Sequence, residues 1–212
     1  PVRAALSVLR SASHRWTFWA LMLTFFVCGW STNGLVQTHF IPAAHDHGMP
    51  ATTAAGLLAL VGIFDLIGTI ASGWLTDRVD PRLLLLAYYG VRGLSLFTIH
   101  SLLAPGVEPG MWVFIIFYGL DWVATVPPTI ALCRSHFGLS HSGIVFGWTF
   151  AAHMIGAGLG AAGLLVLQSL TGYLIGMFSR NLSAQLFGPL IILMLFLNLF
   201  ATLILLIAAW LA

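Results

Sequence analysis

Apolar residues occupy most of this chain in long runs, which short polar junctions separate. A helix needs about 20 apolar residues to cross the roughly 30 Å hydrocarbon core of a bilayer. Six runs are long enough, at residues 16–37, 53–75, 83–103, 111–133, 142–167 and 185–211. The junctions between them carry turn-forming residues such as Pro50, Pro81 and Pro109. The pattern predicts an all-α polytopic membrane protein in which residues 1–212 form a single bundle of six transmembrane helices.

One further apolar stretch, residues 170–178, is too short to span a bilayer. Gly172 and Gly176 interrupt it. We therefore expect an interfacial or re-entrant piece there, with a seventh short span as the alternative.

The composition supports a membrane protein. Of 212 residues, 59% are hydrophobic and only 7% are charged, and there is no lysine. A soluble domain averages roughly 25% charged residues, and a chain this apolar would leave more apolar surface than a soluble globule can bury. Disorder is excluded because it requires low hydrophobicity and high net charge.

The arginines predict the orientation of the bundle. Six of the eight fall on one side of a strictly alternating six-span arrangement, namely Arg3, Arg10, Arg15, Arg78, Arg82 and Arg134. The opposite junctions carry Asp46 and Glu108, and Arg180 is the exception. Because cytoplasmic loops carry an excess of positive charge, both termini are predicted to be cytoplasmic. The net charge of +2 reflects this topology and does not indicate nucleic-acid binding.

Four titratable residues lie inside predicted spans, at Asp65, Arg92, Asp121 and His153. Counted from the predicted boundaries, each lies about 15–20 Å deep. A charged side chain at that depth costs roughly 2.5–3.5 kcal/mol on insertion scales, and transporters place their substrate and ion sites there. These residues are therefore candidates for a solute and proton pathway. The alternatives are a structural ion pair of Arg92 with Asp65 or Asp121, and a His153 that only bonds a neighbouring helix.

Small residues and prolines predict how the spans pack. Gly156 and Gly160 form a small-xxx-small pair that allows two helix backbones to approach closely. Pro127 and Pro128 interrupt the fourth span, which should kink and free backbone carbonyls near Asp121. The cysteines, Cys28 and Cys133, are expected to be reduced packing residues.

The junction after the second span carries the most specific motif, Gly73-Trp74-Leu75-Thr76-Asp77-Arg78-Val79-Asp80-Pro81-Arg82. It resembles the G-x-L-[AST]-D-R-x-[GD]-x-R loop signature of the major facilitator superfamily. The resemblance implies that Gly73, Asp77, Arg78 and Arg82 latch the cytoplasmic side. A glycine would allow close helix contact, and an aspartate can cap a helix N-terminus and pair with an arginine.

Neighbouring residues narrow this resemblance to the bacterial monocarboxylate-transporter-like branch. Residues 62–68, with Asp65, are similar to the eighth helix of those carriers. The resemblance covers about residues 7–163 and implies the C-terminal six-helix half of a twelve-helix carrier, built of two three-helix repeats. Eukaryotic members place an arginine where Thr69 stands, so Arg92 is the candidate that would attract an anion. Residues 187–212 are similar to the final helix of the YihY/BrkB membrane family.

These observations lead to two hypotheses. The first is half of a secondary transporter that moves a small anionic, carboxylate-like solute by alternating access, coupled to protons in symport. It implies a lipid bilayer and a second six-helix half as partners, the latter being a missing N-terminal half, a homodimer mate or another subunit. The second is a non-transporting subunit or assembly bundle of a larger membrane complex.

Enzymatic activity is not expected, because the sequence contains no G-x-S-x-G, H-E-x-x-H or C-x-x-C motif. Nor is a metal or cofactor expected. The alternatives are a pigment or haem on His100 or His153, and loose metal binding by His45, Asp46 and His47.

Overall fold

The structure is a computed structural model and describes residues 2–177. Every secondary-structure element over those residues is a helix, and turns or short loops connect them. The elements are α1 (Val2–Ala12), α2 (Trp16–Gly29), the π-helix η1 (Trp30–Gln37), α3 (Thr38–Asp46), α4 (Ala51–Thr76), α5 (Pro81–Leu102), α6 (Pro109–Asp121), α7 (Val126–Phe137) and α8 (Leu139–Met177).

Five helical units within the described residues are long and apolar enough to cross a membrane. They are Trp16–Asp46, Ala51–Thr76, Pro81–Leu102, Pro109–Phe137 and Leu139–Leu167. They correspond to the first five predicted spans, with the third ending at Leu102 one residue before its predicted end. The all-helical polytopic architecture is therefore confirmed. The sixth predicted span, residues 185–211, lies outside the described residues, as do Arg180 and the stretch 187–212.

The prediction of an interfacial or re-entrant piece at residues 170–178 is wrong over the part that the structure describes. The helix α8 continues without a break from Leu139 to Met177. Extending an existing helix requires no new nucleation, and an isolated glycine such as Gly172 costs only about 1 kcal/mol within it. The interruption is therefore too weak to end the helix.

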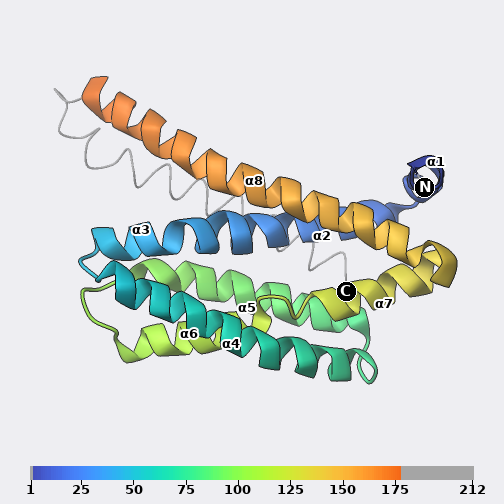
Figure 1. The fold of residues 1–212 in the computed structure, drawn as a ribbon, viewed down its shortest axis with the longest axis horizontal. Helices are drawn as coiled ribbons and strands as arrows, with labels where there is room; N and C mark the ends of the chain where they lie inside the picture. The colour runs from blue at the N-terminus through green and yellow to red at the C-terminus, as the bar shows by residue number, and fades with distance from the viewer. Residues whose placement is uncertain (1, 178–212) are drawn as a thin grey trace.

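The helices run back and forth along one axis, so the connections gather at two ends (Figure 1). The α4–α5 and α7–α8 connections lie at the same end as α1. The six arginines that predicted the orientation lie in or beside these segments, at Arg3, Arg10, Arg15, Arg78, Arg82 and Arg134. The α3–α4 and α5–α6 connections, with Asp46 and Glu108 beside them, lie at the opposite end. We call the first the arginine-bearing end.

The first span is one long helix whose middle is wound as a π-helix. The chain passes from α2 through η1 into α3 with helical backbone at each junction. Ser31 Oγ donates to the carbonyl oxygen of Val27 at 2.9 Å, and Thr32 Oγ1 donates to that of Cys28 at 2.7 Å. These hydroxyl groups satisfy backbone carbonyls where the regular ladder is disturbed.

Glycines on α8 allow it to cross the first span at very short range. A Cβ atom added to Gly156 would overlap the carbonyl oxygen of Phe26, and one added to Gly160 would lie 3.0 Å from that of Trp30. The facing glycines are equally confined, since a Cβ on Gly34 would lie 2.8 Å from the carbonyl oxygen of Ala157. The two backbones are therefore in direct contact, and no side chain can be inserted between them.

Alanine substitution should have opposite effects at two neighbouring glycines of α8. We expect Gly156→Ala to lower the free energy of unfolding by about 1–3 kcal/mol, because the new methyl group forces the helices apart. Gly158 has open space around it. There, Gly158→Ala should be neutral or stabilise by up to about 1 kcal/mol. Thermal unfolding of both variants in detergent tests this, and equal effects would contradict the proposed crossing.

Candidate functional site

The fourth span is broken near its middle. The helix α6 ends at Asp121, residues 122–125 form a turn, and α7 begins at Val126. Pro127 and Pro128 occupy the first turn of α7, where a missing N–H group costs nothing. A helix end leaves backbone groups without intrahelical partners, and inside a membrane these must be satisfied by other parts of the protein.

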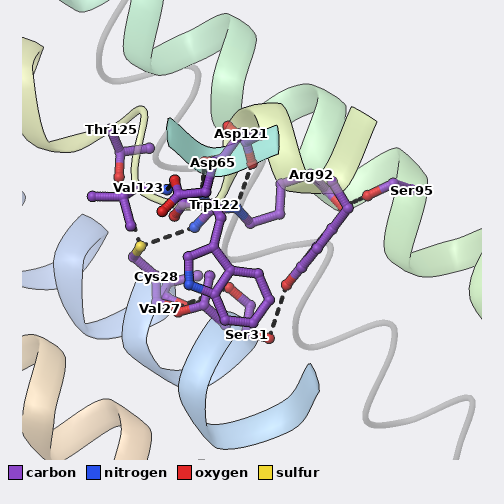
Figure 2. A network of polar contacts seen from close by, with 12 residues as sticks. Val27, Cys28, Ser31, Asp65, Arg92, Ser95, Asp121, Trp122, Val123 and Thr125 are labelled. Atoms are coloured by element: carbon purple, nitrogen blue, oxygen red, sulfur yellow. Dashed lines mark hydrogen bonds and ion pairs between the residues drawn. The ribbon is translucent and has the colours of Figure 1, made fainter. Parts of the chain in front are cut away.

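Arg92 of α5 satisfies the carbonyl side of the break. Its side chain is only 2% exposed. Nη2 donates to the carbonyl oxygens of Asp121 at 2.7 Å and Trp122 at 3.2 Å, while Nε forms an ion pair with Asp121 Oδ2 at 2.6 Å. Nη1 donates to Cys28 Sγ of α2 at 2.9 Å (Figure 2). One guanidinium group thus joins α2, α5 and the end of α6.

Asp65 of α4 satisfies the amide side of the break. Its Oδ1 accepts a hydrogen bond from the backbone N–H of Val123 at 2.9 Å and another from Thr69 Oγ1 at 3.2 Å (Figure 2). Ser72, two turns further along α4, donates from Oγ to the carbonyl oxygen of Ala124. The turn at 122–125 is therefore bound by polar side chains of α4 as well as by Arg92.

Two glycines bring α4 and α6 close enough for these bonds. A Cβ on Gly68 would overlap the carbonyl oxygen of Leu120, and one on Gly119 would lie 2.9 Å from that of Val61. Larger residues at either position would move Asp65 away from the broken helix.

Asp121 uses only one of its two carboxylate oxygens. Oδ2 binds Arg92, whereas Oδ1 is buried and has no hydrogen-bond partner among the described residues. Leaving a buried acceptor unsatisfied costs about 1–3 kcal/mol. The atom is therefore a site where a proton or a donor group would be stabilised.

His153 of α8 lies on the other side of Cys28. Its Nε2 is 3.2 Å from Asn33 Oδ1, and its ring stacks on Phe150 with ring centroids 5.5 Å apart. Its backbone packs against the residue that follows Cys28, because a Cβ added to Gly29 would overlap the carbonyl oxygen of His153. Cys28 thus contacts Arg92 through its side chain and lies next to the point where α8 crosses at His153.

The structure brings the four intramembrane candidates into one region. Arg92 and Asp121 are in direct contact, Asp65 holds the turn that follows Asp121, and His153 packs against the residue that follows Cys28. The sequence left open whether Arg92 pairs with Asp65 or with Asp121, and in the structure it pairs with Asp121. The role of Cys28 was missed, since a thiol in an apolar span gives no signal other than its depth.

The chain can now be compared with known proteins. Residues 1–161 match the Major Facilitator Superfamily. The chain belongs to this superfamily. A relative in Bacillus subtilis (strain 168), named "Uncharacterized MFS-type transporter YcxA", is 28% identical over 154 residues. The match covers 71% of this chain and 37% of the relative, so the chain spans well under half of that protein's length.

Membership of the Major Facilitator Superfamily confirms the resemblance drawn from the loop motif. It also confirms a membrane-embedded chain of a transporter family. The region aligned with this chain is a segment of the longer Bacillus subtilis protein.

The superfamily motif is located in the α4–α5 connection, but its contacts differ from those expected. Asp80, not Asp77, caps α5, because its side chain accepts from the backbone N–H of Arg82 at 2.9 Å. Among residues 2–177 the Arg92–Asp121 pair is the only ion pair, so the expected pairing of Asp77 with an arginine is not formed there. The cap falls to Asp80 because that residue directly precedes Pro81, the first residue of α5.

The remaining motif residues make other contacts within the described part of the chain, and the latch itself stays a prediction. No atom lies within 4 Å of a Cβ added to Gly73, so the predicted close helix contact is absent there. Arg78 stacks on Trp74, 4.1 Å from its ring centroid, and Arg82 Nη2 lies 3.2 Å from His136 Nε2. These contacts join the loop to the end of α4 and to the end of α7.

Removing the Asp65 carboxylate should loosen the break. We expect Asp65→Ala to cost about 1–3 kcal/mol of stability, because the N–H of Val123 loses its acceptor. Asp65→Asn keeps an acceptor oxygen and should cost less. Hydrogen exchange at the Val123 amide, measured by mass spectrometry, should accelerate strongly in Asp65→Ala and weakly in Asp65→Asn. Equal, slow exchange in both variants would contradict this role.

Proposed function

We propose that this chain forms one six-helix half of a secondary active transporter in a bacterial inner membrane, which moves a small carboxylate-like anion together with a proton by alternating access. The observation that carries the proposal is the buried Arg92–Asp121 ion pair at a broken helix. Its depth in the spans is where transporters of this kind place solute and ions.

The charge balance of the pair explains how proton and anion would be coupled. With Asp121 ionised, the pair is neutral and Arg92 is occupied. A proton that binds Asp121, at the unsatisfied Oδ1, leaves Arg92 with an uncompensated charge in a region that disfavours it. A solute anion restores neutrality by taking the place of the carboxylate. Because only the neutral combinations are stable when buried, proton and anion cross together.

The chemistry of Arg92 defines the solute class. A guanidinium group presents a planar set of N–H donors that matches a carboxylate in two parallel hydrogen bonds. Cys28, Trp122 and the hydroxyl groups near the pair belong to small or aromatic side chains, and Arg92 is the only permanently charged cation among the site residues described above. The site therefore fits a small anion with one carboxylate.

Asp65 and His153 have supporting roles in this proposal. Asp65 is already engaged by Val123 and Thr69, so we assign it to holding the break and not to carrying the proton. His153 would relay protons along the Cys28 side. The second half, whether an N-terminal half, a second copy or another subunit, would close the opposite wall of the pathway.

Uptake by the native gene product in proteoliposomes tests the proposed function. With an inward proton gradient, we expect accumulation of short radiolabelled monocarboxylates and little of neutral or cationic analogues of the same size. Collapse of the gradient with an ionophore should stop accumulation. A protein that folds and inserts but moves none of these solutes under any gradient would favour the non-transporting subunit instead.

A further inference from the structure

A polar cavity lies at the arginine-bearing end of the bundle and shares no lining residue with the buried ion pair. Its volume is about 370 Å³, within the usual range of small-molecule sites, about 300–1,000 Å³. It lies between α1, the end of α7 and the start of α8. Its walls include side chains with donor groups and one aromatic ring, namely Ser7, Ser11, Arg15, His136, His141 and Phe137.

The helix α1 forms a fixed wall of this cavity. Ala12 is 3% exposed and belongs to a core cluster that also contains Phe18 and Val145. Trp148 of α8 donates from Nε1 to the carbonyl oxygen of Ala5 at 3.3 Å. Because α1 is bound to the bundle at both positions, the cavity is part of the fold.

Arg15 supplies a cation that the protein does not neutralise. Nη1 donates to the carbonyl oxygen of His136 at 2.6 Å, and the guanidinium lies 5.6 Å from the centroid of the Phe137 ring. Within residues 2–177 its other nitrogens have no hydrogen-bond partner, and no carboxylate lines the cavity. Arg82 approaches His136 from the far side, which adds positive charge. The cavity therefore favours an anion.

The surroundings place this cavity at the level of lipid headgroups. Trp16 and Trp19 lie directly after Arg15 and are 66% and 50% exposed. Exposed tryptophans at the end of a membrane span are typical of the membrane–water interface. Leu6 of α1 is 52% exposed, so this helix also presents an apolar side chain beside its arginines.

We propose that this cavity binds a phosphate group at the membrane surface, with Arg15 as its main contact. Arginine matches phosphate oxygens with parallel N–H donors, and serine hydroxyl and histidine ring N–H groups complete such a set. The phosphate belongs either to an anionic phospholipid headgroup or to a soluble phosphate compound. The site is independent of solute transport and would hold α1 against the α7–α8 connection.

Lipid and phosphate titrations of the purified native protein test the site. Delipidated protein in detergent is titrated with short-chain phosphatidylglycerol, with the matching diacylglycerol, which lacks phosphate, and with inorganic phosphate. Native mass spectrometry records lipid adducts, and thermal unfolding records stabilisation. We expect phosphatidylglycerol to bind at least roughly tenfold more tightly than diacylglycerol, as one charge-assisted hydrogen-bond pair predicts.

Three variants assign the binding to this cavity. Arg15→Gln should lose roughly tenfold in affinity. Ser11→Phe should lose as much by filling the cavity while Arg15 remains. Arg10→Gln removes an equal charge from α1 outside the cavity lining and should lose at most roughly twofold, as expected for an exposed, screened charge. Stabilisation by inorganic phosphate alone identifies a soluble ligand, whereas binding of the lipid alone identifies a headgroup.

Equal retention of diacylglycerol and phosphatidylglycerol would overturn the proposal. So would unchanged binding in Arg15→Gln and Ser11→Phe, or an equal loss in Arg10→Gln, which would indicate only a diffuse positive surface. Circular dichroism of each variant checks that it is folded. Since Ser11 is exposed, its variant keeps the test valid if Arg15→Gln proves unstable.

Discussion

Replacing Arg92 by glutamine is expected to abolish solute transport and to destabilise the protein strongly. The change removes the cation that would bind the solute and leaves the buried Asp121 carboxylate without its counter-charge. Breaking a buried ion pair in this way lowers the free energy of unfolding by about 3–5 kcal/mol. It also deprives two carbonyl oxygens at the helix break of their donor. Uptake in proteoliposomes should fall by roughly 100-fold or more, as the loss of several charge-assisted hydrogen bonds predicts.

A double variant separates the two effects. Arg92→Gln with Asp121→Asn removes both charges, so much of the lost stability should return while transport stays absent. Arg134→Gln is the matched control, because Arg134 is exposed at the arginine-bearing end. It should retain both stability and uptake. Normal uptake in Arg92→Gln would show that this arginine does not bind the solute.

Replacing Asp121 by asparagine is expected to separate anion movement from proton movement. Asparagine keeps the shape of the side chain but cannot take up a proton. Arg92 remains attached to the carbonyl oxygens of residues 121 and 122 and stays available to an anion. Exchange of labelled for unlabelled solute across the membrane should therefore continue, while accumulation driven by a proton gradient should disappear.

The stability of the same variant gives an independent readout. Asp121→Asn leaves Arg92 without its counter-charge, so the unliganded protein should unfold at a lower temperature than the native one. A carboxylate solute should stabilise the variant more than it stabilises the native protein, because it supplies the missing charge. Asp65→Asn should show neither the loss of coupling nor the added solute effect. Gradient-driven accumulation that persists in Asp121→Asn would exclude this residue as the proton site.

Much of this fold could be predicted from the sequence because the bilayer fixes the length and polarity of each span. Five runs of apolar residues form helices that are long and apolar enough to span a membrane for that reason. The cost of intramembrane charge identified Asp65, Arg92 and Asp121 in the same way. The pairing of Arg92 with Asp121 rather than Asp65 could not be derived, because depth alone does not give rotation about the helix axis.

Features that depend on contacts between distant segments were not predictable. The π-helix at Trp30–Gln37 shows no local signal, and the confined Gly68 cannot be told from the open Gly62 by composition. Asp77 and Asp80 are both suited to capping, and only the start of α5 at Pro81 decides between them. The helix break at residues 122–125 could be predicted in part. Its prolines were evident in the sequence, whereas the side chains that bind its free backbone groups come from two other helices, α4 and α5.

The stoichiometry of proton and solute movement tests the central proposal most directly. Proteoliposomes containing the native gene product and an internal pH dye are mixed with a monocarboxylate in the absence of any pH gradient. In the proposed mechanism a proton neutralises the Asp121 carboxylate, and the solute anion then pairs with Arg92 in its place. Each anion should therefore enter with one proton. Internal acidification should follow solute entry, and an imposed membrane potential should leave the rate unchanged. Solute entry that is driven by the potential without acidification would contradict the account.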